Sequence, residues 1–97
     1  MSAFNIVKFR VKPGCEQQLI DAHRGVREGL KGFKRGVLVD TGERTFCFIG
    51  EWESFANIAA SRDQMITILD RFRDTLEDLG DGKGVTDPVS GEAVLEA

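Results

Sequence analysis

The chain has 97 residues, of which 41% are apolar and 30% are charged, with a net charge of −3. This composition is typical of a single globular domain over residues 1–97 and excludes a disordered or low-complexity chain. The acidic balance argues against a nucleic-acid partner, no apolar run is long enough to cross a membrane, and no basic leader precedes an apolar stretch. We therefore expect a cytoplasmic protein in which both cysteines, Cys15 and Cys47, are reduced.

Charge is unevenly distributed, with +4 over the first 45 residues and −7 over the rest. Either the two halves interleave in the fold and the asymmetry disappears, or basic residues line the mouth of a site for an anionic ligand. The candidates for such a mouth are Lys8, Arg10, Lys34 and Arg35. The single histidine, His23, is not spaced to share a metal ion with either cysteine, so the sequence predicts no metal site.

The first predicted element is a strand over residues 4–11, which Pro13 and Gly14 follow as breakers. Alternation places apolar residues on both faces of this strand. One face carries Val7, Phe9 and Val11, and the other carries Phe4 and Ile6 together with Lys8 and Arg10.

A helical period begins at Cys15. Its apolar stripe comprises Leu19, Ala22 or His23, Val26 and Leu30. Gly25 and Gly29 interrupt the stripe, and each costs a helix interior ~1 kcal/mol relative to alanine. With Ala22 they form a strip of small residues that would let another element or a ligand approach the backbone. Alternatively, Gly29 begins the end of the helix that Gly32 completes.

A β-hairpin is predicted next, with strands over 37–39 and 45–49 joined by a polar turn at 40–44. The second strand continues to Trp52. Its run from Phe46 to Ile49 is apolar without alternation, which implies that both of its faces are covered.

Apolar residues then recur at three- and four-residue steps from Phe55 to Leu79. Ser54 is a candidate N-cap, and Ser61 with Gln64 forms a capping-box pattern. We predict a short helix over 54–60, a break, and a main helix over 62–79.

A glycine-rich loop at 80–84 ends that helix. Residues 85–91 are expected to be extended or turn-like because Pro88 forbids a helix there. A short last strand is predicted over 93–95.

This order, β-α-β-β-α-β, is that of the ferredoxin-like fold. Right-handed crossovers place both helices on one face of a four-stranded antiparallel sheet. The other face then lacks cover, although Phe4 and Ile6 point toward it. An exposed apolar face of this size marks an interface, so we expect a homodimer whose two sheets face each other.

Three sequence features resemble the antibiotic biosynthesis monooxygenase-like family. They are Val-Lys-Pro-Gly at 11–14, Gly-Phe at 32–33 before the hairpin, and Glu-Trp-Glu-Ser at 51–54 before the second helix. The resemblance covers roughly residues 4–80. It implies a dimeric α+β barrel with a pocket between each sheet and its helices. It also implies one of several activities: some members oxidise anionic phenols with molecular oxygen and neither metal nor flavin, others degrade haem, and others have no established activity.

Departures from the family pattern argue against some of these activities. The haem-degrading members use a first-strand asparagine, and alignment on the Pro-Gly turn places Val7 there, with Asn5 two residues away. They also use a histidine in the second helix, whereas this chain has none after Trp52. Haem degradation is therefore disfavoured, and we expect no cofactor. The phenol-oxidising members have a pocket tyrosine, and this sequence contains no tyrosine.

The candidate site residues converge on the cleft between the first helix and the sheet. His23 is either a half-buried structural histidine or a general base, since its ordinary pKa is near neutrality. Val7 and Phe9 would form an apolar floor. Trp52 either packs at the end of its strand as a structural residue or lines the site beside an aromatic ligand. Arg62 either extends its charged group from the helix to solvent or binds an anionic group.

Two functions remain open at this level. The first is a cofactor-independent monooxygenase acting on a small aromatic or anionic molecule, with His23 as the catalytic base. The second is a non-catalytic dimeric protein of the same fold that binds a small molecule or serves in stress. Whether the chain is an enzyme is left open by its sequence.

Overall fold

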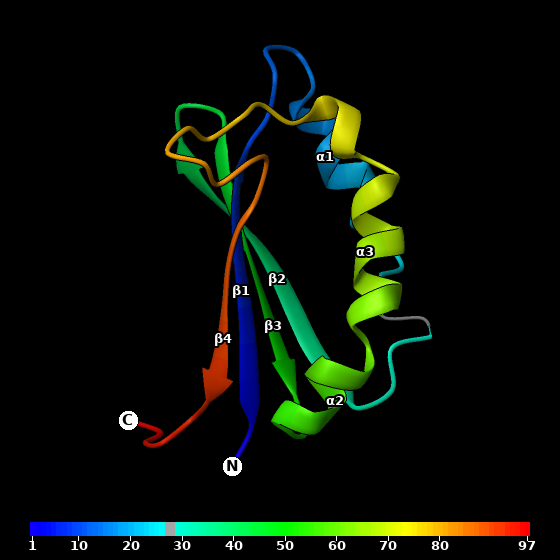
Figure 1. Ribbon diagram of the computed structural model, residues 1–97, viewed down its shortest axis with the longest axis vertical. Helices are drawn as coiled ribbons and strands as arrows, with labels where there is room; N and C mark the ends of the chain where they lie inside the picture. Colours follow the sequence, from blue (N-terminus) through cyan, green and yellow to red (C-terminus); the bar gives the residue numbers. More distant parts are fainter. Residues whose placement is uncertain (27–28) are drawn as a thin grey trace.

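The computed structural model describes residues 1–26 and 29–97 (Figure 1). Its elements are β1 (Ala3–Arg10), α1 (Glu16–Ala22), β2 (Phe33–Gly42), β3 (Thr45–Trp52), α2 (Phe55–Ala60), α3 (Arg62–Asp70), the short 3₁₀ helix η1 (Arg73–Thr75) and β4 (Asp87–Glu92). None of the helices in the described ranges has the length and apolarity needed to span a membrane.

The four strands form one antiparallel sheet in the order β2-β3-β1-β4. Figure 1 shows α1, α2 and α3 together on one side of this sheet. The predicted ferredoxin-like α+β fold is therefore confirmed.

The strand register separates the sheet into two faces. The inner face, toward the helices, includes Asn5, Val7 and Phe9 of β1 and Phe48 and Trp52 of β3. The outer face has its own apolar set, because β1 and β3 alternate in phase. That set comprises Phe4, Ile6, Val37, Val39, Ile49 and Val89.

The predicted first helix is wrong in its length. It ends at Ala22, and the chain then turns through Gly25 and Gly29, whose φ values are +73° and +81°. A Cβ added to either glycine would meet nothing within 4 Å, so the small residues do not admit a close neighbour. They allow left-handed backbone conformations in the stretch that follows the helix.

The second helical region divides as predicted, but its main helix is shorter. The Ser54 hydroxyl caps α2 by accepting a hydrogen bond from the Asn57 amide at 3.2 Å. Ser61 makes no such side-chain bond, so the capping-box prediction is wrong. Helix α3 ends at Asp70 rather than at residue 79, and Leu76 instead forms a β-bridge with Val11.

The last strand lies earlier than predicted. It is β4, over Asp87–Glu92, whereas Val94 and Leu95 lie outside the sheet and are largely exposed. Pro88 is tolerated because β4 is an edge strand that pairs only with β1.

The buried side chains form two clusters at opposite ends of the inner face. The cluster near the end of β1 comprises Phe9, Val11, Leu19, Phe46, Phe72 and Leu76. The cluster near its start comprises Ala3, Leu30, Trp52 and Ile58. Between them, the inner-face residues Asn5 and Val7 line a cavity.

Candidate functional site

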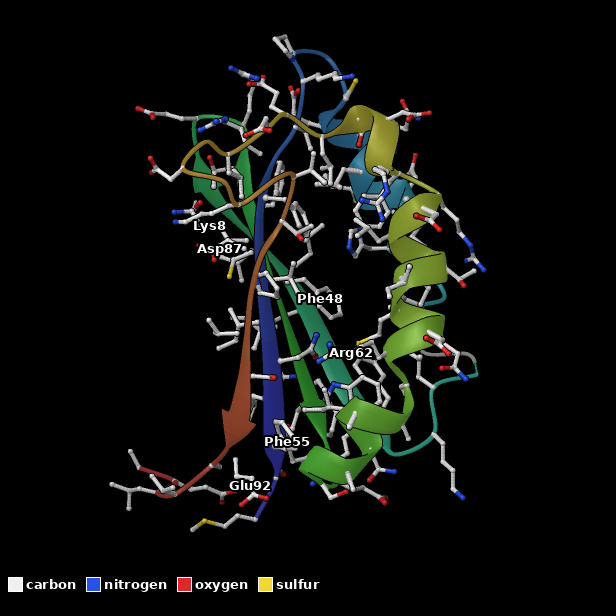
Figure 2. All side chains as sticks on the ribbon, in the orientation of Figure 1. Lys8, Phe48, Phe55, Arg62, Asp87 and Glu92 are labelled. Carbon is white, nitrogen blue, oxygen red and sulfur yellow. The ribbon has the colours of Figure 1, made fainter. Side chains whose placement is uncertain are left out.

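A cavity of about 320 Å³ lies between the inner face of the sheet and the helices. Strand residues form its floor, and α2 and α3 form its roof. Figure 2 shows Phe48 in the gap between the sheet and α3. This volume is at the lower end of the range of small-molecule sites in proteins.

The cavity lining is mostly apolar. The floor contains Asn5, Val7, Phe9, Phe33, Phe48 and Trp52, and the side next to β4 contains Thr86, Pro88, Val89 and Ser90. The roof contains Ile58, Arg62, Met65, Ile66, Ile68, Leu69 and Phe72, and the stretch between α1 and β2 contributes His23, Val26 and Leu30. Arg62 is the single charged residue among the described lining residues.

His23 lies at the end of α1 within a group of aromatic rings. Its ring centroid is 5.7 Å from that of Phe9, 5.4 Å from that of Phe48 and 4.7 Å from that of Phe72. Burial among these rings lowers the pKa of His23, and a hydrogen bond to the Leu19 carbonyl opposes part of that effect. The imidazole is therefore neutral at pH 7.

The protonation state of each ring nitrogen follows from its partner. Nδ1 of His23 lies 2.9 Å from the Leu19 carbonyl oxygen, and a carbonyl can only accept. Nδ1 must carry the proton, which leaves Nε2 as an acceptor. A neutral imidazole with a free acceptor nitrogen, on the wall of an apolar cavity, can take a proton from a bound acid.

Trp52 and Asn5 form the polar part of the cavity floor. The Trp52 indole N–H donates to Oδ1 of Asn5 at 2.7 Å, and both residues are almost fully buried. Because that bond fixes the amide orientation, Nδ2 of Asn5 points toward Met65, whose sulfur accepts a long contact of 3.8 Å. A thioether is a weak acceptor, so this amide retains donor capacity for a ligand oxygen.

Two inner-face glycines make room for these side chains. Gly36 and Gly50 face each other across β2 and β3. A Cβ on Gly36 would lie 2.8 Å from atoms of both Phe33 and Phe48, and one on Gly50 would overlap the Asn5 amide oxygen. The cavity floor therefore depends on the absence of side chains at this pair.

Arg62 begins α3 and lines the cavity near the Asn5 end. In Figure 2 it is labelled in the lower part of the gap between the sheet and α3. It is exposed, and no described residue forms an ion pair with it. Arg62 lies at the start of α3, whereas His23 contacts Phe72 just after the end of that helix, so Arg62 and His23 lie toward opposite ends of the cavity.

The structure thus places all five residues selected from the sequence along one cavity. Val7, Phe9, His23, Trp52 and Arg62 each line it. Phe9 and Trp52 are also core residues, with 1% of their surface exposed. The indole N–H of Trp52 is used by Asn5, so this side chain holds another residue in place as well as forming a wall.

Asn5 was not predicted to line the cavity, although the strand alternation that selected Val7 and Phe9 places Asn5 on the same face. Neither Met65 nor the aromatic group around His23 was predicted. The alternative prediction, that basic residues line the mouth of this site, is wrong. None of Lys8, Arg10, Lys34 and Arg35 lines the cavity. In Figure 2 Lys8 lies on the side of the sheet away from the helices. The described residues also contain no cluster of metal-ligating side chains.

Comparisons with known proteins support the fold assignment. No protein-family model matches the sequence, and no curated protein matches it significantly. Among solved structures, a presumed antibiotic biosynthesis monooxygenase from Nitrosomonas europaea has a TM-score of 0.76 at 16% identity, covering 96% of this chain and 90% of that one.

Two further solved structures have names that state an oxygenase activity. SnoaB, a cofactor-independent oxygenase from Streptomyces nogalater, has a TM-score of 0.75 at 11% identity and covers 98% of this chain and 95% of its own. The monooxygenase from the gene ActVA-Orf6 of Streptomyces coelicolor, in complex with nanaomycin D, has a TM-score of 0.70 at 17% identity and covers 99% and 93%. The chain therefore has the antibiotic biosynthesis monooxygenase-like fold.

Proposed function

We propose that this protein is a cofactor-independent monooxygenase that acts on a small aromatic, anionic molecule held in the cavity between helices and sheet. The observation that carries the proposal is His23 on the wall of a mostly apolar cavity, with Nδ1 bonded to the Leu19 carbonyl so that Nε2 is the acceptor. The fold shared with oxygenases adds support at the level of analogy.

In the proposed reaction, Nε2 of His23 removes a proton from an acidic group of the substrate, such as a phenolic hydroxyl. The resulting anion is electron-rich enough to reduce molecular oxygen. For a substrate carbon that carries two hydrogens, RH₂ + O₂ gives R=O + H₂O, so one oxygen atom enters the product and the other leaves as water. The apolar walls exclude bulk water from the reactive anion.

The other polar groups have separate roles in this scheme. Arg62, an exposed cation on the cavity lining, attracts an anionic substituent of the substrate. The Asn5 amide, oriented by Trp52, donates to a carbonyl or phenolate oxygen of the ligand. Val7 and Phe9 provide the flat apolar floor on which an aromatic ring can lie.

We further propose that the functional unit is a homodimer formed through the outer face of the sheet. The apolar set on that face is exposed in one chain, with 36% of Val37, 39% of Val39 and 60% of Val89 accessible. Burying this set removes apolar surface from water, which stabilises the dimer by about 25 cal/mol for each Å² buried.

A binding measurement tests the first part of the proposal. The fluorescent probe 8-anilinonaphthalene-1-sulfonate is both aromatic and anionic, and we expect saturable binding with one probe per chain. Arg62→Gln should weaken binding about tenfold, and the matched control Arg73→Gln should not, because Arg73 lies outside the cavity and pairs with Asp70. Equal affinities for both variants would contradict the role of Arg62.

Turnover is tested with an oxygen electrode and a panel of polyhydroxylated naphthalenes. We expect protein-dependent oxygen uptake for at least one compound, and His23→Gln should reduce it ~10²-fold while leaving probe affinity nearly unchanged. Turnover no faster than in buffer across the panel, or an unaltered rate in His23→Gln, would contradict the proposed chemistry.

A further inference from the structure

Met65 contributes a thioether sulfur to the cavity lining, and no step of the proposed reaction uses it. The residue lies in α3, three positions after Arg62, and is partly buried. Its side chain packs against the buried cluster near the start of β1, which includes Trp52 of the cavity floor. A chemical change at this sulfur would therefore alter both the roof of the cavity and its contact with the floor.

The sulfur of Met65 is directed toward the polar group of the floor. It lies 3.8 Å from Nδ2 of Asn5, whose Oδ1 accepts the indole N–H of Trp52. The amide orientation is therefore fixed, with its N–H donors on the side of the sulfur. Because a thioether accepts hydrogen bonds only weakly, the amide can still donate to a ligand oxygen.

Hydrogen peroxide can reach this sulfur through the cavity. The cavity volume of about 320 Å³ far exceeds that of a water molecule, about 30 Å³, and hydrogen peroxide is only a little larger than water. Met65 is also partly exposed. Met1, the other methionine of the chain, has 76% of its surface exposed and so provides an internal reference for an unprotected thioether.

We propose that Met65 is an oxidation site that switches off ligand binding in the cavity. In this reaction, R–S–R′ + H₂O₂ gives R–S(=O)–R′ + H₂O. A sulfur lone pair forms the new S–O bond, the O–O bond breaks, and peroxide is reduced to water by the two electrons that sulfur loses. The inference rests on the proposed function, because it requires that the Asn5 amide donates to the ligand.

The sulfoxide changes the hydrogen bonding of the cavity floor. Its oxygen is a much stronger acceptor than the thioether sulfur, and Nδ2 of Asn5 already faces that sulfur. The new oxygen therefore competes with the ligand oxygen for the same amide. The polar sulfoxide also replaces part of the apolar surface on which an aromatic ligand packs. Both effects weaken ligand binding, and enzymatic reduction of the sulfoxide would restore it.

Peptide mass spectrometry and probe binding test the proposal on the wild-type chain. After graded treatment with hydrogen peroxide, we expect Met65 to gain one oxygen atom at a rate within about tenfold of that of Met1. The dissociation constant of 8-anilinonaphthalene-1-sulfonate should rise about fivefold as Met65 becomes fully oxidised. Saturating probe should slow the oxidation of Met65 and leave that of Met1 unchanged, because the probe fills the route to Met65.

Two substitutions of Met65 separate its oxidation from damage elsewhere. Met65→Leu conserves apolar volume and cannot be oxidised, so its probe affinity should be close to that of the wild type and insensitive to peroxide. This variant retains Cys15 and Cys47, so any effect of thiol oxidation appears in it as well. Met65→Gln places an amide oxygen near the position of the sulfoxide oxygen and should weaken probe binding about fivefold without peroxide.

The matched control for Met65→Gln is Thr67→Gln. Thr67 is an exposed residue of α3 that does not line the cavity, so this variant should keep the wild-type probe affinity. Equal weakening in both glutamine variants would assign the effect to α3 in general and overturn the role of Met65.

The remaining outcomes distinguish the oxidation switch from the binding function. The switch would be overturned, with the binding function intact, by unchanged probe affinity after Met65 is oxidised, by an equal loss of affinity in peroxide-treated Met65→Leu, or by a Met65 that stays reduced when Met1 is fully oxidised. Absence of probe binding by the untreated protein would overturn the binding function and the switch with it.

Discussion

At the scale of single residues, His23 links the chemistry of the cavity to the stability of the fold. Burial among Phe9, Phe48 and Phe72 lowers its pKa below the ordinary value of about 6.5. The unfolded chain therefore binds the proton more readily than the folded chain does. The stability that depends on neutral His23 is fully present above about pH 6.5 and is lost as pH falls toward the lowered folded pKa.

We expect the free energy of unfolding to decrease between pH 7.5 and pH 5.5, and to decrease less in His23→Gln. Glutamine retains a donor for the Leu19 carbonyl but does not titrate. The carboxylates whose pKa values are lowered, Asp21, Glu51 and Glu77, titrate below this range. Urea denaturation at both pH values measures the change in the free energy of unfolding for each protein. Equal changes in the two proteins would show that the pKa of His23 does not differ between the folded and unfolded chains.

Gly50 provides a second prediction at this scale, because its missing side chain makes room for the Asn5 amide. Gly50→Ala should displace Asn5, break its hydrogen bond with Trp52, and destabilise the fold by about 1–3 kcal/mol. Trp52 is the only tryptophan, so its fluorescence reports the change directly.

The matched control for that variant is Gly91→Ala. Gly91 is in β4, and a Cβ there would meet nothing within 4 Å. Its substitution should change the unfolding free energy by less than about 0.5 kcal/mol. Similar losses in the two variants would show that the space beside Asn5 is not the cause.

At the scale of elements, the β2–β3 hairpin contains local strain at its turn. Glu43 and Arg44 have φ values of +55° and +61°, in the left-handed region that disfavours most side chains. Arg44 is held there by contacts with the Val11 carbonyl and the Glu77 carboxylate. The pairing of β2 with β3 and the contact of Arg44 with Glu77 together outweigh the conformational cost of this turn.

Glu43→Asn should therefore stabilise the protein by about 0.5–1 kcal/mol, because asparagine adopts the left-handed conformation at lower cost. Glu43 is exposed and makes no ion pair with a described residue, so little is lost. Thermal denaturation beside the control Glu53→Asn, at an exposed position whose φ is not positive, measures the gain. A melting temperature that falls for Glu43→Asn would contradict this account of the turn.

At the scale of the whole molecule, the sheet has helices on one face and none on the other. We predict a homodimer in solution, seen as a species of twice 10.7 kDa by sedimentation at micromolar concentration. Ile49→Lys should convert it to a monomer, since a lysine charge in an apolar contact is strongly unfavourable. A wild-type chain that sediments as a monomer at tens of micromolar would contradict the dimer.

Local patterns in the sequence were sufficient to predict the order of elements, the hairpin, the N-cap at Ser54 and the two-sided apolar character of β1. Strand alternation alone selected Val7 and Phe9 as cavity-floor residues, because the two-residue period depends only on neighbours along the chain. Helix lengths were overestimated, since apolar periodicity continues through Val26 and Leu30, although the first helix ends at Ala22.

Tertiary structure decided the features that involve residues distant in sequence. The bond between Asn5 and Trp52 joins positions 47 residues apart, and the aromatic group around His23 draws from β1, β3 and the segment after α3. The pairing of β4 with β1, through a strand with poor intrinsic propensity, likewise depends on an available sheet edge. The sequence determined which side chains could form a site. Packing decided that His23 is neutral, that Trp52 orients Asn5, and that Arg62 lines the same cavity. Each of these features depends on neighbours in space, which the local periodicity of the sequence does not specify.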